Sequence, residues 1–367
     1  MKSNKIKIFT IGGATFDIFV QAEDQSLITF QTPKASRKWL AFPHGGKVRV
    51  KAVLETFGGG ATNTAVTFAG MGFETYFVGM IGKEYGEKVL GNLAAHGICS
   101  DYVCLTDKDR TGFSNIINTF DGDRTLLYYA GANRFFKAQH LPLEALKTAD
   151  WIFLSHMADR KSKVPMKLLE LLKKYPHIKL AWNPGREQIE EGIEVWKDLL
   201  KHTEVLFLNK EEAAQFTGIH YQLAGNKQDD PGKHVCNEKC FLPPYADDSS
   251  GALKALIKKG VKVAVITDGR NGVQANDGKK SYFCSVLTNK RVDTLGAGDA
   301  YASGFTSALM KGLPLNMALI YGTINAGSVV NHPGAQNGLM TELEMKKAMK
   351  KNKIEVKVKN ENKKSFK

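Results

Sequence analysis

The run from Asp293 to Asp299, with sequence DTLGAGD, combines two carboxylates with a glycine-rich turn. It leads into an apolar stretch, from Ala300 to Leu309, that predicts a helix. Small residues let a backbone turn tightly and gather N–H groups at a helix N-terminus, where those groups and the helix dipole favour an anion. Such a turn can hold a negatively charged group while Asp299 accepts a proton from an attacking hydroxyl as a general base. The alternative is an Asp-capped glycine-rich turn without a chemical role.

A second glycine cluster, GGGATN from Gly58 to Asn63, begins another apolar stretch, from Thr64 to Met71, that predicts a helix. Backbone this bare lets a ligand approach closely, and the side chain of Asn63 can both donate and accept hydrogen bonds. Neither cluster is a Walker loop, and neither follows a strand as the dinucleotide-binding fingerprint requires. The two clusters therefore indicate a ligand site that differs from the commonest glycine-rich nucleotide loops.

Together, these two clusters resemble the paired signatures of the ribokinase-like (PfkB) carbohydrate kinase family, in the family's order and at about its separation. The run NKEE from Asn209 to Glu212 resembles the family's N-x-x-E element, and TDGRNG from Thr267 to Gly272 resembles its nucleotide-phosphate turn. Two shorter runs also match, Gly131-Ala132-Asn133 and Gly334-Ala335-Gln336. The resemblance covers the chain from roughly residue 6 to residue 345.

The resemblance implies ATP-dependent phosphorylation of a primary hydroxyl of a sugar, a reaction that rests on positioning and charge stabilisation. It makes Asp299 the general base and the backbone of Gly296, Ala297 and Gly298 the anion hole. It assigns acceptor binding to Asp17, Gly58, Gly59 and Asn63. It assigns nucleotide binding to Asn209, Thr267, Gly269, Gly272 and Asn325. It gives Glu212 a role in organising Mg²⁺ through water, and it allows a monovalent cation such as K⁺ at Asp293.

Several of these residues have a second interpretation. Asn209 and Glu212 have the spacing of a helix N-cap and its capping-box partner. Asp17 could simply cap a turn. Ribokinase-like members often carry lysine where Gly60 stands, which weakens the inference that the sugar is ribose. A nucleoside kinase of the same family, with an aromatic slot, is one rival function; a catalytically silent ligand-binding protein on this fold is another. The side chains that could supply the slot are Trp39, Phe42 and Phe135.

Alternating apolar runs and helical patterns predict an α/β fold with a central, mostly parallel sheet flanked by helices on both faces. Strands are expected at Ile6–Ile11, Thr75–Met80, Trp151–Ser155, Ile178–Trp182, Val205–Leu208 and Val261–Thr267. Further helices are expected at Gly86–His96, Val164–Tyr175, Ile193–His202, Gly251–Lys259 and Leu315–Asn331. The resemblance adds a small β-rich lid from about residues 16–56 and 100–130. Residues 219–249 have the composition of an irregular insertion.

Composition limits the partners of this chain. The formal net charge is +14, but residues 345–367 contain ten Lys and two Glu, so this tail carries +8 and the remainder only +6. Nucleic acid is therefore not the expected partner, and no apolar stretch approaches the length of a membrane span. Five scattered cysteines suit a reducing cytoplasm. We expect a kinase domain over residues 1–345, a last short helix with a solvated, frayed end over 346–367, and a lid that allows homodimerisation.

Overall fold

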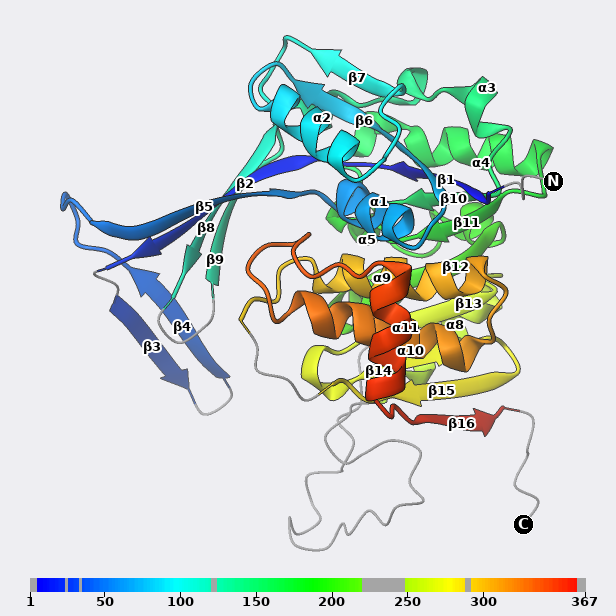
Figure 1. The fold of residues 1–367 in the computed structure, drawn as a ribbon. Helices are drawn as coiled ribbons and strands as arrows, with labels where there is room; N and C mark the ends of the chain where they lie inside the picture. The colour runs from blue at the N-terminus through cyan, green and yellow to red at the C-terminus, as the bar shows by residue number, and fades with distance from the viewer. Residues whose placement is uncertain are drawn as a thin grey trace, which may run out of the picture.

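The computed structural model describes residues 5–23, 26–32, 35–119, 124–219, 248–287 and 292–361, and its centre is one ten-stranded sheet (Figure 1). The strand order is β16-β15-β14-β13-β12-β11-β10-β1-β6-β7. In chain order the strands are β1 (Lys7–Ile11), β6 (Glu74–Gly82), β7 (Val103–Thr106), β10 (Trp151–Leu154), β11 (Lys179–Trp182), β12 (Thr203–Asn209), β13 (Val263–Thr267), β14 (Val273–Asn276), β15 (Lys280–Cys284) and β16 (Val356–Asn360).

The sheet is parallel from β7 to β13 and antiparallel from β13 to β16. Its parallel part confirms the α/β class, and all the strands expected in the central sheet are present. Parallel strands place their carboxyl ends at one edge, where ligands bind in such folds. The sheet therefore gathers the residues that follow β1, β10, β12 and β13.

Helices cover both faces of the sheet. The helices are α1 (Gly60–Gly70), α2 (Gly86–Ala95), α3 (Leu143–Leu146), α4 (Val164–Lys174), α5 (Arg186–Glu191), α6 (Lys197–Leu200), α7 (Lys210–Thr217), α8 (Ser250–Lys258), α9 (Ala297–Met310), α10 (Leu315–Val329) and α11 (Glu342–Lys351). Short 3₁₀ turns lie at Gly131–Phe135, Ala138–His140, Arg160–Ser162 and Gly269–Asn271. The helix expected at Ile193–His202 is shorter than predicted, because only α6 is helical there.

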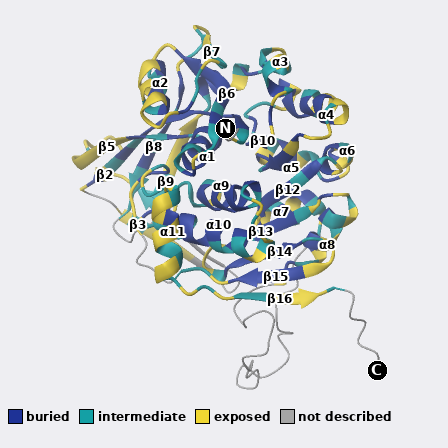
Figure 2. Cartoon of the chain, turned by 45° about the vertical axis from the view of Figure 1, so that its right-hand side comes forward, coloured by how far each residue is buried: buried dark blue, intermediate teal, exposed yellow. Residues whose placement is uncertain are grey.

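Side-chain alternation along the strands explains why a layer of helices covers each face of the central sheet. On β10, Ile152 and Leu154 join the core formed with α3 to α8, whereas Trp151 and Phe153 join the core formed with α1, α9, α10 and α11. Successive residues of a strand point to opposite faces, so a strand with apolar residues throughout must be covered on both sides. Figure 2 shows the strands of this sheet largely in the colour of buried residues.

The lid is a separate four-stranded sheet that projects from one side of the central layers (Figure 1). Its strand order is β5-β2-β8-β9, formed by β2 (Thr15–Ala22), β5 (Val50–Gly58), β8 (Gly112–Asn118) and β9 (Arg124–Tyr129). Beyond it, β3 (Ser26–Thr32) and β4 (Ala35–Ala41) pair with each other. One prediction needs correction: residues 103–106 form β7 and belong to the central sheet, because they pair with β6.

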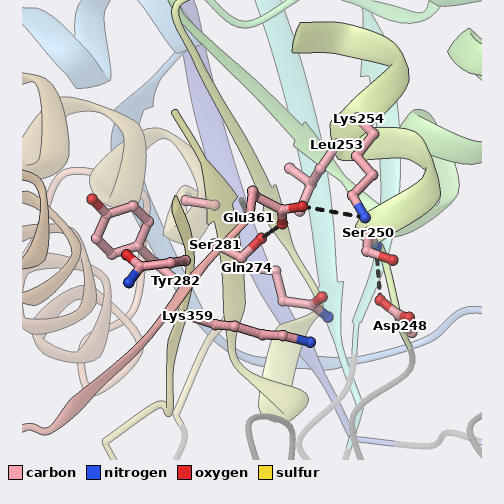
Figure 3. A pocket seen from close by; sticks show the side chains of 11 residues that line it. Asp248, Ser250, Leu253, Lys254, Gln274, Ser281, Tyr282, Lys359 and Glu361 are labelled. Atoms are coloured by element: carbon pink, nitrogen blue, oxygen red, sulfur yellow. Dashed lines mark hydrogen bonds and ion pairs between the residues drawn. The ribbon is translucent and has the colours of Figure 1, made fainter. Parts of the chain in front are cut away.

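The C-terminal segment also differs from the prediction. Residues 356–360 do not fray into solvent but form β16, which pairs with β15 along the edge of the central sheet. A hollow of about 390 Å³ lies between α8 and strands β14 to β16, and Glu361 enters it (Figure 3). The Glu361 carboxylate pairs with Lys254 at 3.3 Å and accepts hydrogen bonds from the hydroxyl of Ser281 and the amide of Asn276. These polar contacts hold the segment against the sheet.

Most of the predicted insertion, from residue 220 to residue 247, lies outside the described residues, as do residues 362–367. The hollow beside Glu361 contains none of the predicted site residues.

Candidate active site

The predicted anion turn forms the N-terminus of α9. Gly296 has φ 73°, a left-handed conformation that favours glycine, and a Cβ placed there would lie 2.6 Å from Cβ of Ala335. Gly296 is therefore required both by its backbone angle and by the close approach of the 334–338 loop. A Cβ on Gly298 would meet nothing within 4 Å, so the space in front of the helix N-terminus is open. A helix N-terminus of this kind has N–H groups that can bind an anion, and of the three predicted donors the Ala297 N–H donates to the Thr294 carbonyl at 3.3 Å.

Asp299 lies in the first turn of α9 and is held by Asn63 of the second glycine cluster, Gly58–Asn63. Asn63, on α1, donates from Nδ2 to Asp299 Oδ2 at 2.8 Å. Its Oδ1 accepts from Gln336 Nε2 at 3.1 Å, and Gln336 Oε1 accepts from Asn92 Nδ2 at 2.8 Å. These hydrogen bonds fix the orientation of the carboxylate. They also use the Asn63 amide for a purpose other than the predicted acceptor contact.

Burial raises the pKa of Asp299, while the Asn63 hydrogen bond and the charge of His156 act in the opposite direction. A carboxylate with a raised pKa is a stronger base, so the environment suits proton abstraction. The sequence interpretation missed His156. The available signal was its place directly after the strand predicted at Trp151–Ser155, at the edge of the sheet where ligands bind.

Ser155 and His156 occupy the space beside Gly60. A Cβ on Gly60 would lie 2.2 Å from Oγ of Ser155 and 3.2 Å from the His156 ring. Ser155 Oγ and His156 Nδ1 are 3.3 Å apart. This chain therefore needs glycine at position 60 because two polar side chains from the loop after β10 lie there.

Asp17 is the third residue of β2, at the point where the lid sheet leaves the core. Its side chain is buried, and Oδ1 has no hydrogen-bond partner among the described residues. Burial raises the pKa of Asp17 to about 6 against the opposing hydrogen bonds of Thr15 and Ser114, and the charge of Asp293 raises it further. A Cβ on Gly58 would lie 2.1 Å from Asp17 Oδ2. The structure thus brings Asp17 and Gly58 of the second glycine cluster together, and Asp17 Oδ1 remains an acceptor without a partner there.

A cavity of about 340 Å³ adjoins the anion turn. Its lining includes the predicted nucleotide residues Asn209, Thr267 and Gly269 together with Ala297 and Gly298 of the turn. The remaining wall is mostly apolar and is formed by Val273, Val286, Leu287, Thr294, Tyr301, Thr323, Ala326, Gly327 and Val330. A mostly apolar lining that includes the start of a helix suits a nucleotide, because a helix N-terminus can hold its phosphates.

Two predicted nucleotide residues do not line this cavity. Asn325 is fully buried; it donates to Thr67 Oγ1 at 3.3 Å and to the Ala300 carbonyl at 2.8 Å, and it accepts from Met340 N–H at 3.0 Å. Its amide therefore ties α10 to α9, and its neighbours Ala326 and Gly327 face the cavity instead. Gly272 is buried between β13 and β14, where a Cβ would lie 2.6 Å from the Cys284 carbonyl.

Asn209 and Glu212 form the capping box that was the alternative interpretation of their spacing. Asn209 Oδ1 accepts from Glu212 N–H and Glu212 Oε2 accepts from Asn209 N–H, each at 2.8 Å. Burial raises the pKa of Glu212, and the nearby charges of Glu211 and Asp299 add to the effect. Within the described ranges, no group of three or more His, Cys, Asp or Glu side chains could hold a metal ion.

Asp293 is also brought to the turn, where it is buried. Its Oδ1 accepts from Leu295 N–H at 2.9 Å, and its Oδ2 accepts from Gly334 N–H at 3.0 Å. Arg124, from the lid, forms an ion pair with the same carboxylate.

The described helices include none with the length and apolar character needed to cross a bilayer.

The profile of the pfkB family carbohydrate kinases matches residues 27–342. The ribokinase of Bacillus subtilis (strain 168) is 26% identical over 312 residues, covering 84% of this chain and 92% of the relative. A nucleoside kinase of Methanocaldococcus jannaschii is 24% identical over 312 residues, covering 84% and 90%.

Solved structures agree in fold. The ribokinase of Arabidopsis thaliana complexed with ribose and ATP aligns with a TM-score of 0.71 at 22% identity, covering 94% of this chain and 99% of that chain. The M. jannaschii nucleoside kinase aligns with a TM-score of 0.67 at 20% identity, covering 95% and 99%. Sugar kinases and nucleoside kinases thus both occur among the relatives, and similarity alone does not choose the acceptor.

Proposed function

Because the chain belongs to the pfkB family of carbohydrate kinases, and is thus a kinase of sugars or nucleosides, we propose that it transfers the terminal phosphoryl group of ATP to a primary hydroxyl of a sugar. The observation that carries this proposal is the position of Asp299. Its carboxylate is held by Asn63 beside an open helix N-terminus, and that terminus also lines the nucleotide-sized cavity.

The proposed reaction uses the two sides of the turn for different tasks. Asp299 accepts the proton of the acceptor hydroxyl as its oxygen attacks the phosphorus, and ADP leaves on the cavity side. The N–H groups at the start of α9, from Gly296 to Gly298, stabilise the charge on the transferring phosphoryl group. The bond from phosphorus to the ADP oxygen breaks as the bond to the acceptor oxygen forms. The lid would exclude water, which otherwise competes as the phosphoryl acceptor.

Mg²⁺ is implied by this chemistry, and the donor set fits it. Carboxylates are the oxygen ligands that Mg²⁺ prefers, usually together with waters and substrate phosphates. Glu212 lies close enough to Asp299 for the charge of Asp299 to raise its pKa, so a cation there would relieve repulsion between the two carboxylates. We assign Glu212 to holding Mg²⁺ through water, with Asn209 orienting Glu212; the ion would neutralise phosphate charge.

We assign acceptor binding to Asp17, whose unpartnered Oδ1 can accept from a hydroxyl, and whose two oxygens suit a pair of sugar hydroxyls. A nucleoside acceptor would need an aromatic slot. Phe135 contacts Lys108 and Arg134, and Trp39 contacts Phe30 beyond the lid sheet. The choice of a sugar therefore rests on the Asp17 carboxylate and not on these rings.

A coupled ADP-release assay across pentoses, hexoses, phosphosugars and nucleosides tests the proposal. We expect ADP release that depends on Mg²⁺ and on one class of sugar. Turnover of nucleosides alone would select the rival kinase function. Retained ligand binding with no turnover of any acceptor would indicate a silent binding protein.

We also propose that two copies pair through the lid in the cytoplasm. Several apolar side chains on both faces of the lid strands are exposed, and exposed apolar surface commonly marks an interface. They are Val53 at 58%, Leu127 at 55%, Leu126 at 43% and Leu54 at 41% exposure. Sedimentation equilibrium of the wild type and of Leu127→Glu tests this: a dimer that the substitution dissociates is expected, and a wild-type monomer at all concentrations contradicts it.

A further inference from the structure

The first residue of β9, Arg124, reaches from the lid to the anion turn. Arg124 begins β9, an edge strand of the lid sheet, where it pairs with Asn118 of β8. Its Nη1 lies 3.1 Å from Asp293 Oδ1 and donates to Thr294 Oγ1 at 2.5 Å. Only 21% of the Arg124 side chain and 3% of the Asp293 side chain are exposed. This is therefore a largely buried ion pair that joins the lid to the first two residues of DTLGAGD.

Asp293 is the residue at which the family resemblance allows a monovalent cation, so the fit of such an ion can be examined. The carboxylate already accepts from Leu295 N–H at 2.9 Å, from Gly334 N–H at 3.0 Å and from Arg124. A carboxylate offers about four lone-pair positions, and three of these have donors. A potassium ion on the same carboxylate would lie beside a guanidinium of like charge, which is unfavourable in a buried place. The described contacts do not fit a cation in addition to Arg124.

We propose that Arg124 is a positioning residue that supplies, from the lid, the positive charge at Asp293 that a monovalent cation would otherwise supply. This inference rests on the proposed kinase function. Through Asp293 the guanidinium acts on two loops at once, since the same carboxylate binds the turn at Leu295 and the loop at Gly334.

The loops that contain Leu295 and Gly334 position the anion turn and the Asp299 carboxylate. Ala335 packs under Gly296, and Gln336 donates to the Asn63 amide that orients Asp299. A lid that carries Arg124 onto Asp293 therefore completes the anion hole and the general base together. Movement of the lid away from the core withdraws the charge and loosens the turn. Catalytic geometry is in this way coupled to the position of the lid, without an added ion.

Turnover in potassium chloride and in tetramethylammonium chloride, at matched ionic strength, tests the inference. We expect the wild type to run at the same rate in both salts. Arg124→Ala should lose roughly 10- to 100-fold in kcat, as for a lost charge-assisted hydrogen bond to a buried carboxylate. It should regain rate with potassium, or with guanidinium far below denaturing concentrations, because either cation can fill the vacated place. Arg49→Ala, which removes an exposed lid arginine, is the matched control and should match the wild type.

Amide hydrogen exchange of the ligand-free protein gives a readout that does not depend on activity. Arg124→Ala and Asp293→Asn should each increase exchange in β8, β9 and residues 293–299, and Arg49→Ala should not. Strong potassium activation of the wild type would overturn the inference, as would an Arg124→Ala variant that matches Arg49→Ala in rate and exchange. Failure of the wild type to phosphorylate any acceptor would refute the proposed function, whereas the exchange result would still decide whether Arg124 holds the turn.

Discussion

Replacing Asp17 by asparagine should stabilise the ligand-free protein while it removes acceptor binding. Asp17 is 3% exposed and its pKa is raised from 3.8 to about 6, mainly by burial. The difference corresponds to about 3 kcal/mol at 1.36 kcal/mol per pKa unit. Above about pH 6 the ionised Asp17 carboxylate therefore lowers the free energy of unfolding by an amount of that order. Asparagine is neutral and nearly isosteric, so it does not lower the stability in this way. Thr15 and Ser114 can reverse their hydroxyl donors to suit the amide.

The sign of the pH dependence follows from the raised pKa. The folded state binds the Asp17 proton more tightly than the unfolded state, so the wild type loses stability as pH rises from about 4 to about 6. Asp17→Asn lacks this loss. Its advantage over the wild type should be small near pH 4, should grow through that window, and should be constant above about pH 6 at up to about 3 kcal/mol.

Urea unfolding of both proteins at a series of pH values measures this difference, with Asp107→Asn, at an exposed aspartate, as the matched control. Calorimetric titration with the acceptor found in the ADP-release assay measures binding, which should be lost in Asp17→Asn and kept in the control. A destabilised Asp17→Asn protein would show that structural hydrogen bonds hold the buried carboxylate, and a stability gain that does not change with pH would contradict the raised pKa. Unchanged acceptor binding in Asp17→Asn would overturn the acceptor assignment.

Two further substitutions test the surroundings of the base. Glu212→Gln keeps an oxygen that can accept from Asn209 N–H, so we expect normal melting but slower turnover and a higher Mg²⁺ requirement; an unchanged Mg²⁺ titration contradicts the metal assignment. His156→Gln removes a charge that lowers the pKa of Asp299, so the acidic limb of the profile of kcat/KM against pH should move to higher pH. If the acidic limb of the His156→Gln profile stays at its wild-type pH in the same buffers, then His156 does not influence the pKa of Asp299.

The central sheet could be predicted because its strands are short apolar runs buried on both faces. A run such as Trp151–Leu154 can bury its apolar side chains on both faces only inside a parallel sheet that helices cover on both sides. The C-terminal strand could not be predicted in this way. In Val356–Asn360, lysine alternates with valine within a Lys-rich segment, and this composition suits a solvated end as well as an edge strand. The pairing depends on the free edge of β15 and on the contacts of Glu361, which are tertiary.

The site was predictable where backbone chemistry decides it. The positive φ of Gly296 and the helix N-terminus after it follow from the residue types. Side-chain direction was not predictable. Asn325 lies on the correct helix but points into the core, and its neighbours face the cavity. His156 matters because it lies near Asp299, and Arg124 matters because it forms an ion pair with Asp293. A single histidine or arginine in a sequence does not indicate which carboxylate will be its neighbour in the fold.

The central claim is that Asp299 is the general base, and Asp299→Asn tests it most directly. Asparagine keeps the size of the side chain and can still accept from Asn63 Nδ2, so melting temperature and affinity for ATP and acceptor should stay close to the wild type. General-base catalysis typically contributes about 100- to 10,000-fold, and we expect turnover to fall by that amount. Single-turnover rates measured with saturating ATP and acceptor, on protein shown to be folded, give the answer. A variant that phosphorylates the acceptor at nearly the wild-type rate would contradict the account.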